Sequence, residues 1–162
     1  LLWLDANDTS SIAQTTGVVD AWNDKGSNGN NLTPHNSSNP ITGLNTQNGL
    51  NVITFDGDDI LTIDASNNIG DFDQTWFIVA QIDNNGVNNG SDAILSYDNW
   101  TTGTGSWQLS SSNSGSFLGR LLKNTSSIAT STFSNADLSG SFHLFNFSFD
   151  RTNEIHSNGW MV

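Results

Sequence analysis

The sequence predicts an all-β protein, built as a two-sheet antiparallel β-sandwich or jelly roll. Its 162 residues are rich in Asn, Ser, Thr and Gly, which favour turns over helix interiors, and Glu154 is the only Glu. About ten short stretches with strand character are separated by polar turns, as in two packed sheets. No window has the apolar spacing of a convincing helix, and at most a turn is expected within residues 135–139. We expect one domain that spans residues 1–162.

The charge of the chain excludes several classes of partner. Acidic residues outnumber basic residues by 16 to 4, for a net charge of -12. Such a field repels phosphate backbones and anionic lipids, so no nucleic-acid partner is expected. No apolar run approaches the roughly 20 residues that span a bilayer, so we expect no membrane insertion. The chain lacks Cys, which excludes disulfides and thiol chemistry. Its composition resembles that of exported proteins, and we expect an extracellular location, on a cell or virion surface.

Before residue 50, a first strand is predicted at residues 1–5 (LLWLD), which are apolar enough to be buried, and the next strand is predicted at residues 18–23. Each contains a tryptophan that we expect in the core, Trp3 and Trp22. The polar segment between these strands is predicted as a loop. Leu32 leads into a second polar loop, which carries both prolines.

Residues 51–63 (NVITFDGDDILTI) are predicted as a central hairpin around which the chain is organised. Ile53 and Phe55 share one side of the first strand, and Leu61 and Ile63 share one side of the second. The intervening DGDD has turn chemistry. Two strands that bury the same side need a second layer over them, which favours a sandwich.

The later strands are predicted from two kinds of apolar pattern. Residues 75–82 (TWFIVAQI) are apolar on both faces, which indicates a strand in the middle of a sheet, covered on each side and with Trp76 in the core. In residues 143–149 three Phe alternate with Asn and Ser, so this strand is expected to bury one face and expose the other. Shorter strands are expected at residues 93–97, 107–110 and 116–122.

An ordered set of motifs carries a family resemblance. The motifs are LWLDA at residues 2–6, WNDKGSNGNN from Trp22, FDGDD-x-L at residues 55–61, WFIVAQI from Trp76, and FHLFNFSFDRT from Phe142 with Asn158-Gly159 after it. The chain resembles the laminin-G-like, concanavalin A-like jelly-roll family of lectins and glucanases. The resemblance implies two curved sheets with binding at the concave face or the rim loops. Because such domains usually continue past the Asn-Gly turn, we expect the closing strands to be missing at Val162 or supplied by another segment. The chain also opens on Leu1, without a Met and inside a predicted strand, so we expect it to be a piece of a longer polypeptide.

Catalysis is not expected. Glycoside hydrolysis needs two facing carboxyl groups about 5 to 10 Å apart, and the glucanase branch of the family places acidic residues, mostly Glu, at alternating positions of one strand. No strand pattern here does so. His35, His143 and His156 are scattered and no Ser lies in a nucleophile elbow, so no triad is predicted. His143 resembles a structural His that opens the equivalent strand in laminin-G-like domains.

Calcium is the metal that the loop residues favour, because carboxylate and amide oxygens are the ligands that a hard cation prefers. Asp56, Asp58 and Asp59 form one candidate cluster, and Asp83 and Asp92, with the Asn residues after Asp83, form another. Neither has EF-hand spacing. The alternative is that these acids cap turns and are simply solvated.

A sugar site is predicted where aromatic residues stand in a polar loop. A ring stacks on the C–H face of a sugar while short polar side chains bond its hydroxyl groups. Tyr97, Asp98, Asn99 and Trp100 fit this description, with Trp107 shortly after them. The alternative is that the Trp100 ring folds back over the sandwich.

These patterns favour a non-enzymatic carbohydrate-recognition or adhesion module on a cell or virion surface. Glycan is the expected partner, and calcium the only cofactor considered. A structural assembly or decoration domain, for example on a phage particle, is the first alternative, with neighbouring protein subunits as partners. A polysaccharide hydrolase or lyase with a degenerate motif is the second.

Overall fold

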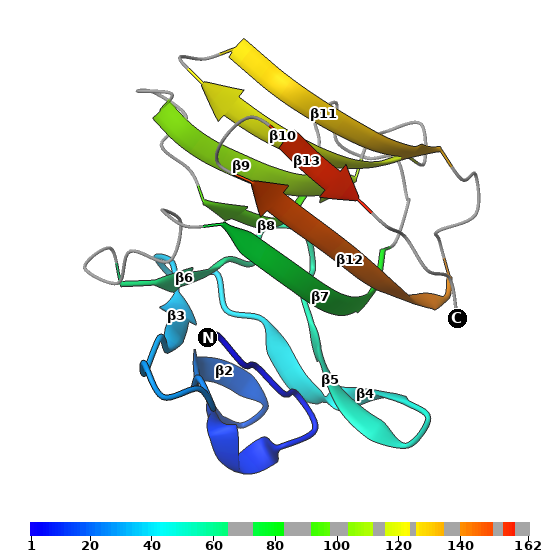
Figure 1. The fold of residues 1–162 in the computed structure, drawn as a ribbon. Coiled ribbons are helices and arrows are strands. Elements are labelled where there is room, and N and C mark those ends of the chain that lie inside the picture. The colour runs from blue at the N-terminus through cyan, green and yellow to red at the C-terminus, as the bar shows by residue number, and fades with distance from the viewer. Residues whose placement is uncertain are drawn as a thin grey trace. The chain divides into compact units, whose positions relative to one another are not determined.

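The structure, a computed structural model, consists of antiparallel β-sheets in two compact units, Leu1–Asn68 and Ile69–Val162 (Figure 1). It describes residues 1–64, 73–82, 92–97, 104–111, 116–123, 126–134, 140–150 and 154–157. The only helix in these ranges is a single 3-10 turn, η1 (Thr9–Ser11). The all-β antiparallel class is therefore confirmed, whereas the jelly-roll connections and the single domain over residues 1–162 stay predictions.

The first unit contains one sheet with the strand order β5-β4-β2-β3-β6, and β1 pairs with β2. Its strands are β1 (Ile12–Thr15), β2 (Val18–Trp22), β3 (Leu32–Pro34), β4 (Ile41–Gln47), β5 (Leu50–Thr54) and β6 (Leu61–Ile63). Three of them, β1, β3 and β4, correct the predicted loops. The sequence does not predict β1, because its residues after Ile12 are exposed and show no apolar alternation. β4 lies in the segment expected to be a polar loop, and its pairing with β5 is irregular between Thr42 and Thr46.

The predicted central hairpin is wrong, although both of its strands exist. β5 pairs with β4 and β6 pairs with β3, so the two strands lie at opposite edges of the sheet. The local reason is a two-residue turn at Asn48 and Gly49, whose positive φ angles of 52° and 77° match the turn type that joins twisted strands tightly. Phe55 lies beyond the end of β5 and is 47% exposed. Residues 55–60 therefore carry the chain from one edge of the sheet to the other.

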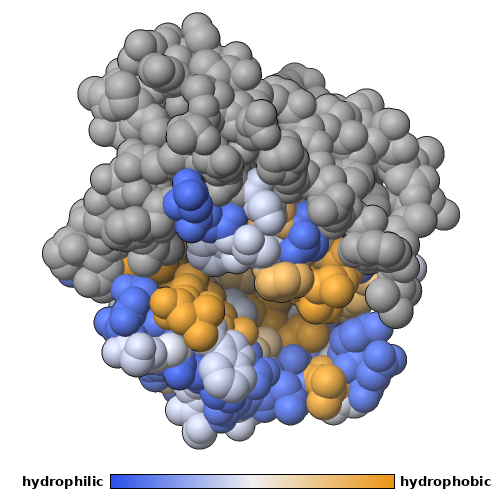
Figure 2. Space-filling model, viewed as in Figure 1, coloured by the Kyte–Doolittle hydropathy of each residue, from blue (hydrophilic) through white to orange (hydrophobic). Residues whose placement is uncertain are grey.

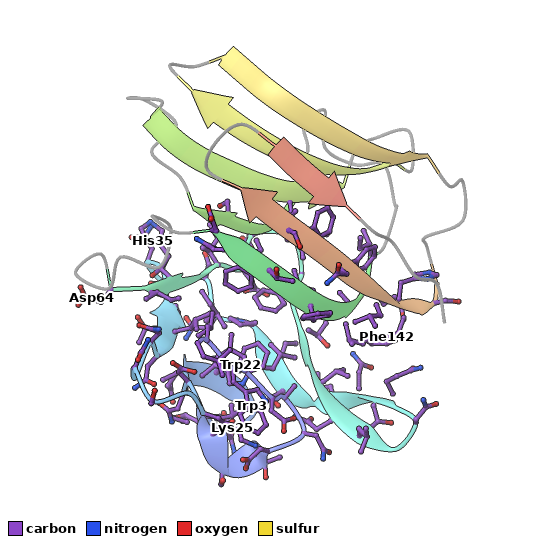
Figure 3. The ribbon with its side chains drawn as sticks, in the orientation of Figure 1. Trp3, Trp22, Lys25, His35, Asp64 and Phe142 are labelled. Atoms are coloured by element: carbon purple, nitrogen blue, oxygen red, sulfur yellow. The ribbon has the colours of Figure 1, made fainter. Side chains whose placement is uncertain are left out.

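The predicted first strand is also wrong, since residues 1–5 form no strand. The Trp3 N–H donates to Asp24 Oδ1 at 2.8 Å, and the Lys25 N–H donates to the Trp3 carbonyl at 2.8 Å. These bonds to a loop replace the ladder of a sheet. The Trp3 side chain, expected in the core, is 52% exposed, and the Lys25 ammonium lies 4.7 Å from the centre of its ring (Figure 3).

Asp24 and Lys25 hold the amino-terminal segment in place. Asp24 Oδ1 also accepts a bond from the Gly26 N–H at 2.7 Å, and Oδ2 accepts one from the Asn30 N–H at 3.0 Å. Lys25 Nζ lies 3.1 Å from Asp5 Oδ2 and 2.7 Å from Asp8 Oδ2. The loop after β2 and the first eight residues thus form one hydrogen-bonded structure, which we call the amino-terminal clamp.

Asn51 ties this clamp to the sheet. Its Nδ2 donates to the Ala6 carbonyl at 2.6 Å and to Thr42 Oγ1 at 2.9 Å, while its Oδ1 accepts from the Gly43 N–H at 3.0 Å. Gly43 has a φ of 81°, which lies in the region that favours glycine. One amide therefore joins the amino-terminal loop to the irregular part of β4.

The second unit is a sandwich of two sheets. One has the order β11-β10-β9-β8 and the other β13-β12-β7 (Figure 1). The strands are β7 (Gln74–Gln81), β8 (Asp92–Tyr97), β9 (Thr104–Ser111), β10 (Ser116–Lys123), β11 (Ser126–Ser134), β12 (Phe142–Asp150) and β13 (Glu154–Ser157). Leu109 of β9 packs against Phe145 and Phe147 of β12, and all three are buried. Trp76 packs against this core, so it lies where the sequence predicts.

β7 differs from its prediction in position and in exposure. Among the described strands it pairs with β12 alone, so it is an edge strand and not a central one. Its side chains alternate between half-buried and exposed, with Phe77 71% and Val79 66% exposed. Continuous apolar sequence indicates cover on both faces, but only the face with Trp76 and Ile78 packs into the core. The alternation predicted for β12 is confirmed, because its two buried Phe point to the core.

Because a carboxylate holds the amino-terminal clamp together, we expect the stability of the protein to depend on pH. Burial raises the pKa of Asp24, but hydrogen bonds from the Trp3, Gly26 and Asn30 N–H groups lower this pKa by more, so the net shift is downward. A carboxyl with a lowered pKa stabilises the fold above its unfolded pKa of about 3.9, and this stability is lost as the pH falls through the folded pKa. At pH 6 we expect Asp24→Asn to melt at a lower temperature than wild type. The difference should be about 2–4 °C for each kcal/mol by which the change lowers the free energy of unfolding.

Melting temperatures measured from pH 7 to pH 2 test this prediction, with Asp20→Asn as control. Asp20 accepts a bond from the Thr15 hydroxyl, so its loss leaves the clamp intact. The difference between wild type and Asp24→Asn should shrink below about pH 4. A difference that stays constant down to pH 2 would contradict the role of the carboxylate.

Candidate functional site

The first candidate site is the acidic turn between β5 and β6. The carboxylates of Asp56, Asp58 and Asp59 offer oxygen atoms within 4.8 Å of one another. The Asp56 N–H donates to Asp59 Oδ2 at 2.8 Å, and Gly57 allows the turn by adopting a φ of 110°. Among the described residues this is the only group of three His or acidic side chains close enough to share an ion. The structure therefore brings the first predicted metal cluster together.

The three carboxyl groups of this turn do not titrate alike. A hydrogen bond between the carboxyl groups of Asp56 and Asp58 lowers the pKa of Asp56 and raises that of Asp58. Burial raises the pKa of Asp59. Like charges this close disfavour full ionisation, and a divalent cation would relieve the repulsion with hard oxygen ligands. The donor set thus fits calcium.

The second predicted metal cluster is not assembled by the described residues. Asp83 lies outside them. Asp92 begins β8, with Ser111 opposite it on β9, but its side chain lies outside the described part. This cluster stays a prediction.

The predicted sugar loop joins β8 to β9. Tyr97 and Trp107 are direct partners across these two strands. Asp98, Asn99 and Trp100 fall between the strands, outside the described residues. The predicted sugar site therefore stays a prediction, with its two ends held on one strand pair.

A different candidate appears on the face of β7 and β12 that points away from the core. Residues directly opposite in an antiparallel pair share a face, so the register defines this surface. Its four rows are Thr75 with Ser148, Phe77 with Asn146, Val79 with Leu144, and Gln81 with Phe142. We call these eight side chains the outward face. Figure 2 shows that apolar side chains are exposed between polar ones on the described surface.

The outward face combines an exposed ring with fixed polar groups, and none of its eight side chains is charged. Phe77 lies opposite Asn146, whose Nδ2 donates to the Trp76 carbonyl at 3.3 Å, which orients the amide beside the ring. In the next row Thr75 Oγ1 and Ser148 Oγ are 3.1 Å apart. Sequence reasoning missed this surface because it assigned the apolar residues of β7 to the core. The alternation of β12 was the signal in the sequence that one of its faces is polar. Only the register shows that Asn146 lies opposite Phe77 and Ser148 opposite Thr75.

His143 lies on the core side of β12, opposite Ala80. Both of its ring nitrogens are buried, and neither has a hydrogen-bond partner among the described residues. The ring centre lies 6.1 Å from that of Phe145, at an angle of 59°. With the Phe145 ring beside it and no hydrogen-bond partner among the described residues, His143 has a packing role in the described geometry.

Comparison with known proteins adds no identification, because the chain matches no protein-family model, no curated protein and no solved structure. The resemblance to laminin-G-like domains therefore rests on the sequence motifs. In the ranges that the structure describes, no helix has the length and apolar character needed to cross a bilayer.

His143 provides a stability test. A buried polar group without a partner costs about 1–3 kcal/mol, and replacing it with an apolar group of similar shape is often neutral or stabilising. We expect His143→Leu to melt at or above the wild-type temperature. As a control, Phe145→Ala should lose about 3–5 kcal/mol. A His143→Leu protein that melts well below wild type would show that the ring has a polar partner.

Proposed function

We propose that this chain is a non-enzymatic carbohydrate-recognition or adhesion module with a laminin-G-like jelly roll, from an extracellular protein on a cell or virion surface. The observation that carries the proposal is the outward face, where the exposed ring of Phe77 stands beside the amide of Asn146. A sugar presents apolar C–H faces and a rim of hydroxyl groups. A ring beside amide and hydroxyl side chains is complementary to both features.

The proposal includes no catalysis. The close carboxylates of Asp56, Asp58 and Asp59 stand together on one turn, whereas glycoside hydrolysis needs two carboxyl groups on either side of the scissile bond. Polysaccharides incubated with the protein should release no new reducing or unsaturated ends. Turnover that a single Asp→Asn change abolishes would revive the hydrolase or lyase alternative.

Glycan binding at the outward face is tested with Phe77→Ala and Leu44→Ala. Both side chains are 71% exposed, so neither change removes much buried surface. Phe77→Ala should lower glycan-array binding by about tenfold or more, because it removes the stacking ring. Leu44→Ala, in the other unit, should bind as wild type does. Equal glycan binding by wild type, Phe77→Ala and Leu44→Ala would show that the outward face is not the glycan-binding surface.

The loop predicted from the sequence is tested separately with Trp100→Ala. If the ring stacks on sugar, the change should abolish glycan binding and leave the melting temperature nearly unchanged. If the ring packs on the sandwich, the change should cost about 3–5 kcal/mol of stability. Unchanged glycan binding with a sharply lower melting temperature would exclude this loop.

Calcium is proposed as the ion of the acidic turn. A ligand that binds only the native state raises its stability by about 2.7 kcal/mol at a concentration 100 times its Kd. Calcium should therefore raise the melting temperature of wild type and of Asp20→Asn, but not that of Asp58→Asn, which loses a carboxylate oxygen. Equal wild-type melting temperatures in calcium and in chelator would mean that the acids are only solvated.

An assembly or decoration domain remains the second candidate, because β7 is an edge strand among the described strands and carries exposed Phe77 and Val79. Unpaired strand edges bind other chains readily unless a charge blocks them. Sedimentation at rising concentration measures this. Self-association that Val79→Lys abolishes and Val79→Thr preserves would favour assembly over glycan binding.

A further inference from the structure

The outward face is uncharged over its eight side chains, and acidic residues begin just beyond its Thr75 end, with the exposed Asp73 before β7 and Asp150 as the last residue of β12. None of its eight side chains ionises, although the chain has a net charge of -12. Of the four basic residues, Lys25 is the one whose side chain the structure describes, and it is bound by Asp5 and Asp8. A uronate or sulfated polymer would meet a repulsive field here with no described cation to offset it. A basic protein would find no carboxylate among these eight side chains, and the first acid along β7 is the exposed Asp73, beyond Thr75.

The pattern along β7 fits a long ligand. Alternate residues of a strand point to one side about 6.8 Å apart, so the row from Thr75 to Gln81 extends over roughly 20 Å, the length of several sugar rings. The apolar side chains of Phe77 and Val79 lie in the middle of this row. The hydroxyl group of Thr75 lies at one end and the amide of Gln81 at the other. A single sugar would contact only part of the row.

From these observations we infer that the outward face binds an uncharged polysaccharide that lies along β7, with Phe77 and Val79 under the sugar rings and Thr75 and Gln81 bonded to their hydroxyl groups. The inference rests on the proposed function and specifies its ligand. Amides and hydroxyl groups both donate and accept, as sugar hydroxyl groups do, so a neutral ligand satisfies them without ion pairing. A second copy of this chain fits less well, since each copy carries the same repulsive charge.

The charge of the ligand is tested at Gln81, which is exposed at the end of the row. Gln81→Lys adds a cation and Gln81→Met is its uncharged control of similar length. Binding to neutral polysaccharides (β-glucan, mannan) and to anionic ones (alginate, heparin) is measured at 20 mM and 300 mM NaCl. We expect wild type to bind a neutral polymer with a Kd that changes less than about twofold with salt. The neutral-polymer Kd of Gln81→Lys should stay within about threefold of that of Gln81→Met.

Length dependence completes the test. Binding should strengthen by about tenfold or more from a disaccharide to a hexasaccharide of the same polymer, because the longer ligand reaches both ends of the row. Equal affinity for the two lengths would overturn the inference. Binding only to anionic polymers, stronger in Gln81→Lys and weaker at high salt, would also overturn it but leave glycan recognition intact. Binding to no polymer would overturn the proposed function itself.

Discussion

The carboxylate of Asp24 organises the first unit. It accepts backbone N–H groups from Trp3, Gly26 and Asn30, which come from two segments with no sheet ladder of their own. Buried or half-buried N–H groups need partners, and one carboxylate supplies three. Because the Lys25 ammonium then lies over the Trp3 ring, the amino-terminal segment is held without being a strand. Removing the carboxylate would break the bond that joins the Trp3 N–H to this loop and leave the Gly26 and Asn30 N–H groups without this acceptor.

The pairing of β7 with β12 has the same importance in the second unit. A single register places Phe145 and Phe147 in the core and, one residue away on the same strand, Asn146 beside Phe77 on the outside. A slip by one residue would exchange the two faces. The core and the candidate sugar surface are thus two consequences of one set of hydrogen bonds, so changes on the outward face can be tested without disturbing buried side chains.

Much of the strand content was predictable from the sequence, but the partners of the strands were not. β2, β7 and β12 were predicted with nearly correct bounds because their apolar residues mark them. The hairpin of β5 with β6 was wrong because turn chemistry at Asp56–Asp59 shows only that the chain turns there. It does not show which strand lies beside it. The candidate sugar surface was missed for a related reason, since β7 has apolar residues on both faces.

The sequence by itself determined the all-β class, the strongly acidic net charge, and the acidic turn. These follow from composition and from residues that are neighbours in the chain. Only the tertiary structure decided that residues 1–5 are clamped to a loop, that β5 and β6 lie at opposite sheet edges, and that Phe77 is exposed beside Asn146. Each of these depends on hydrogen bonds between segments far apart in sequence. Local patterns show which side chains can be buried, but the register and neighbours of each strand decide which ones are.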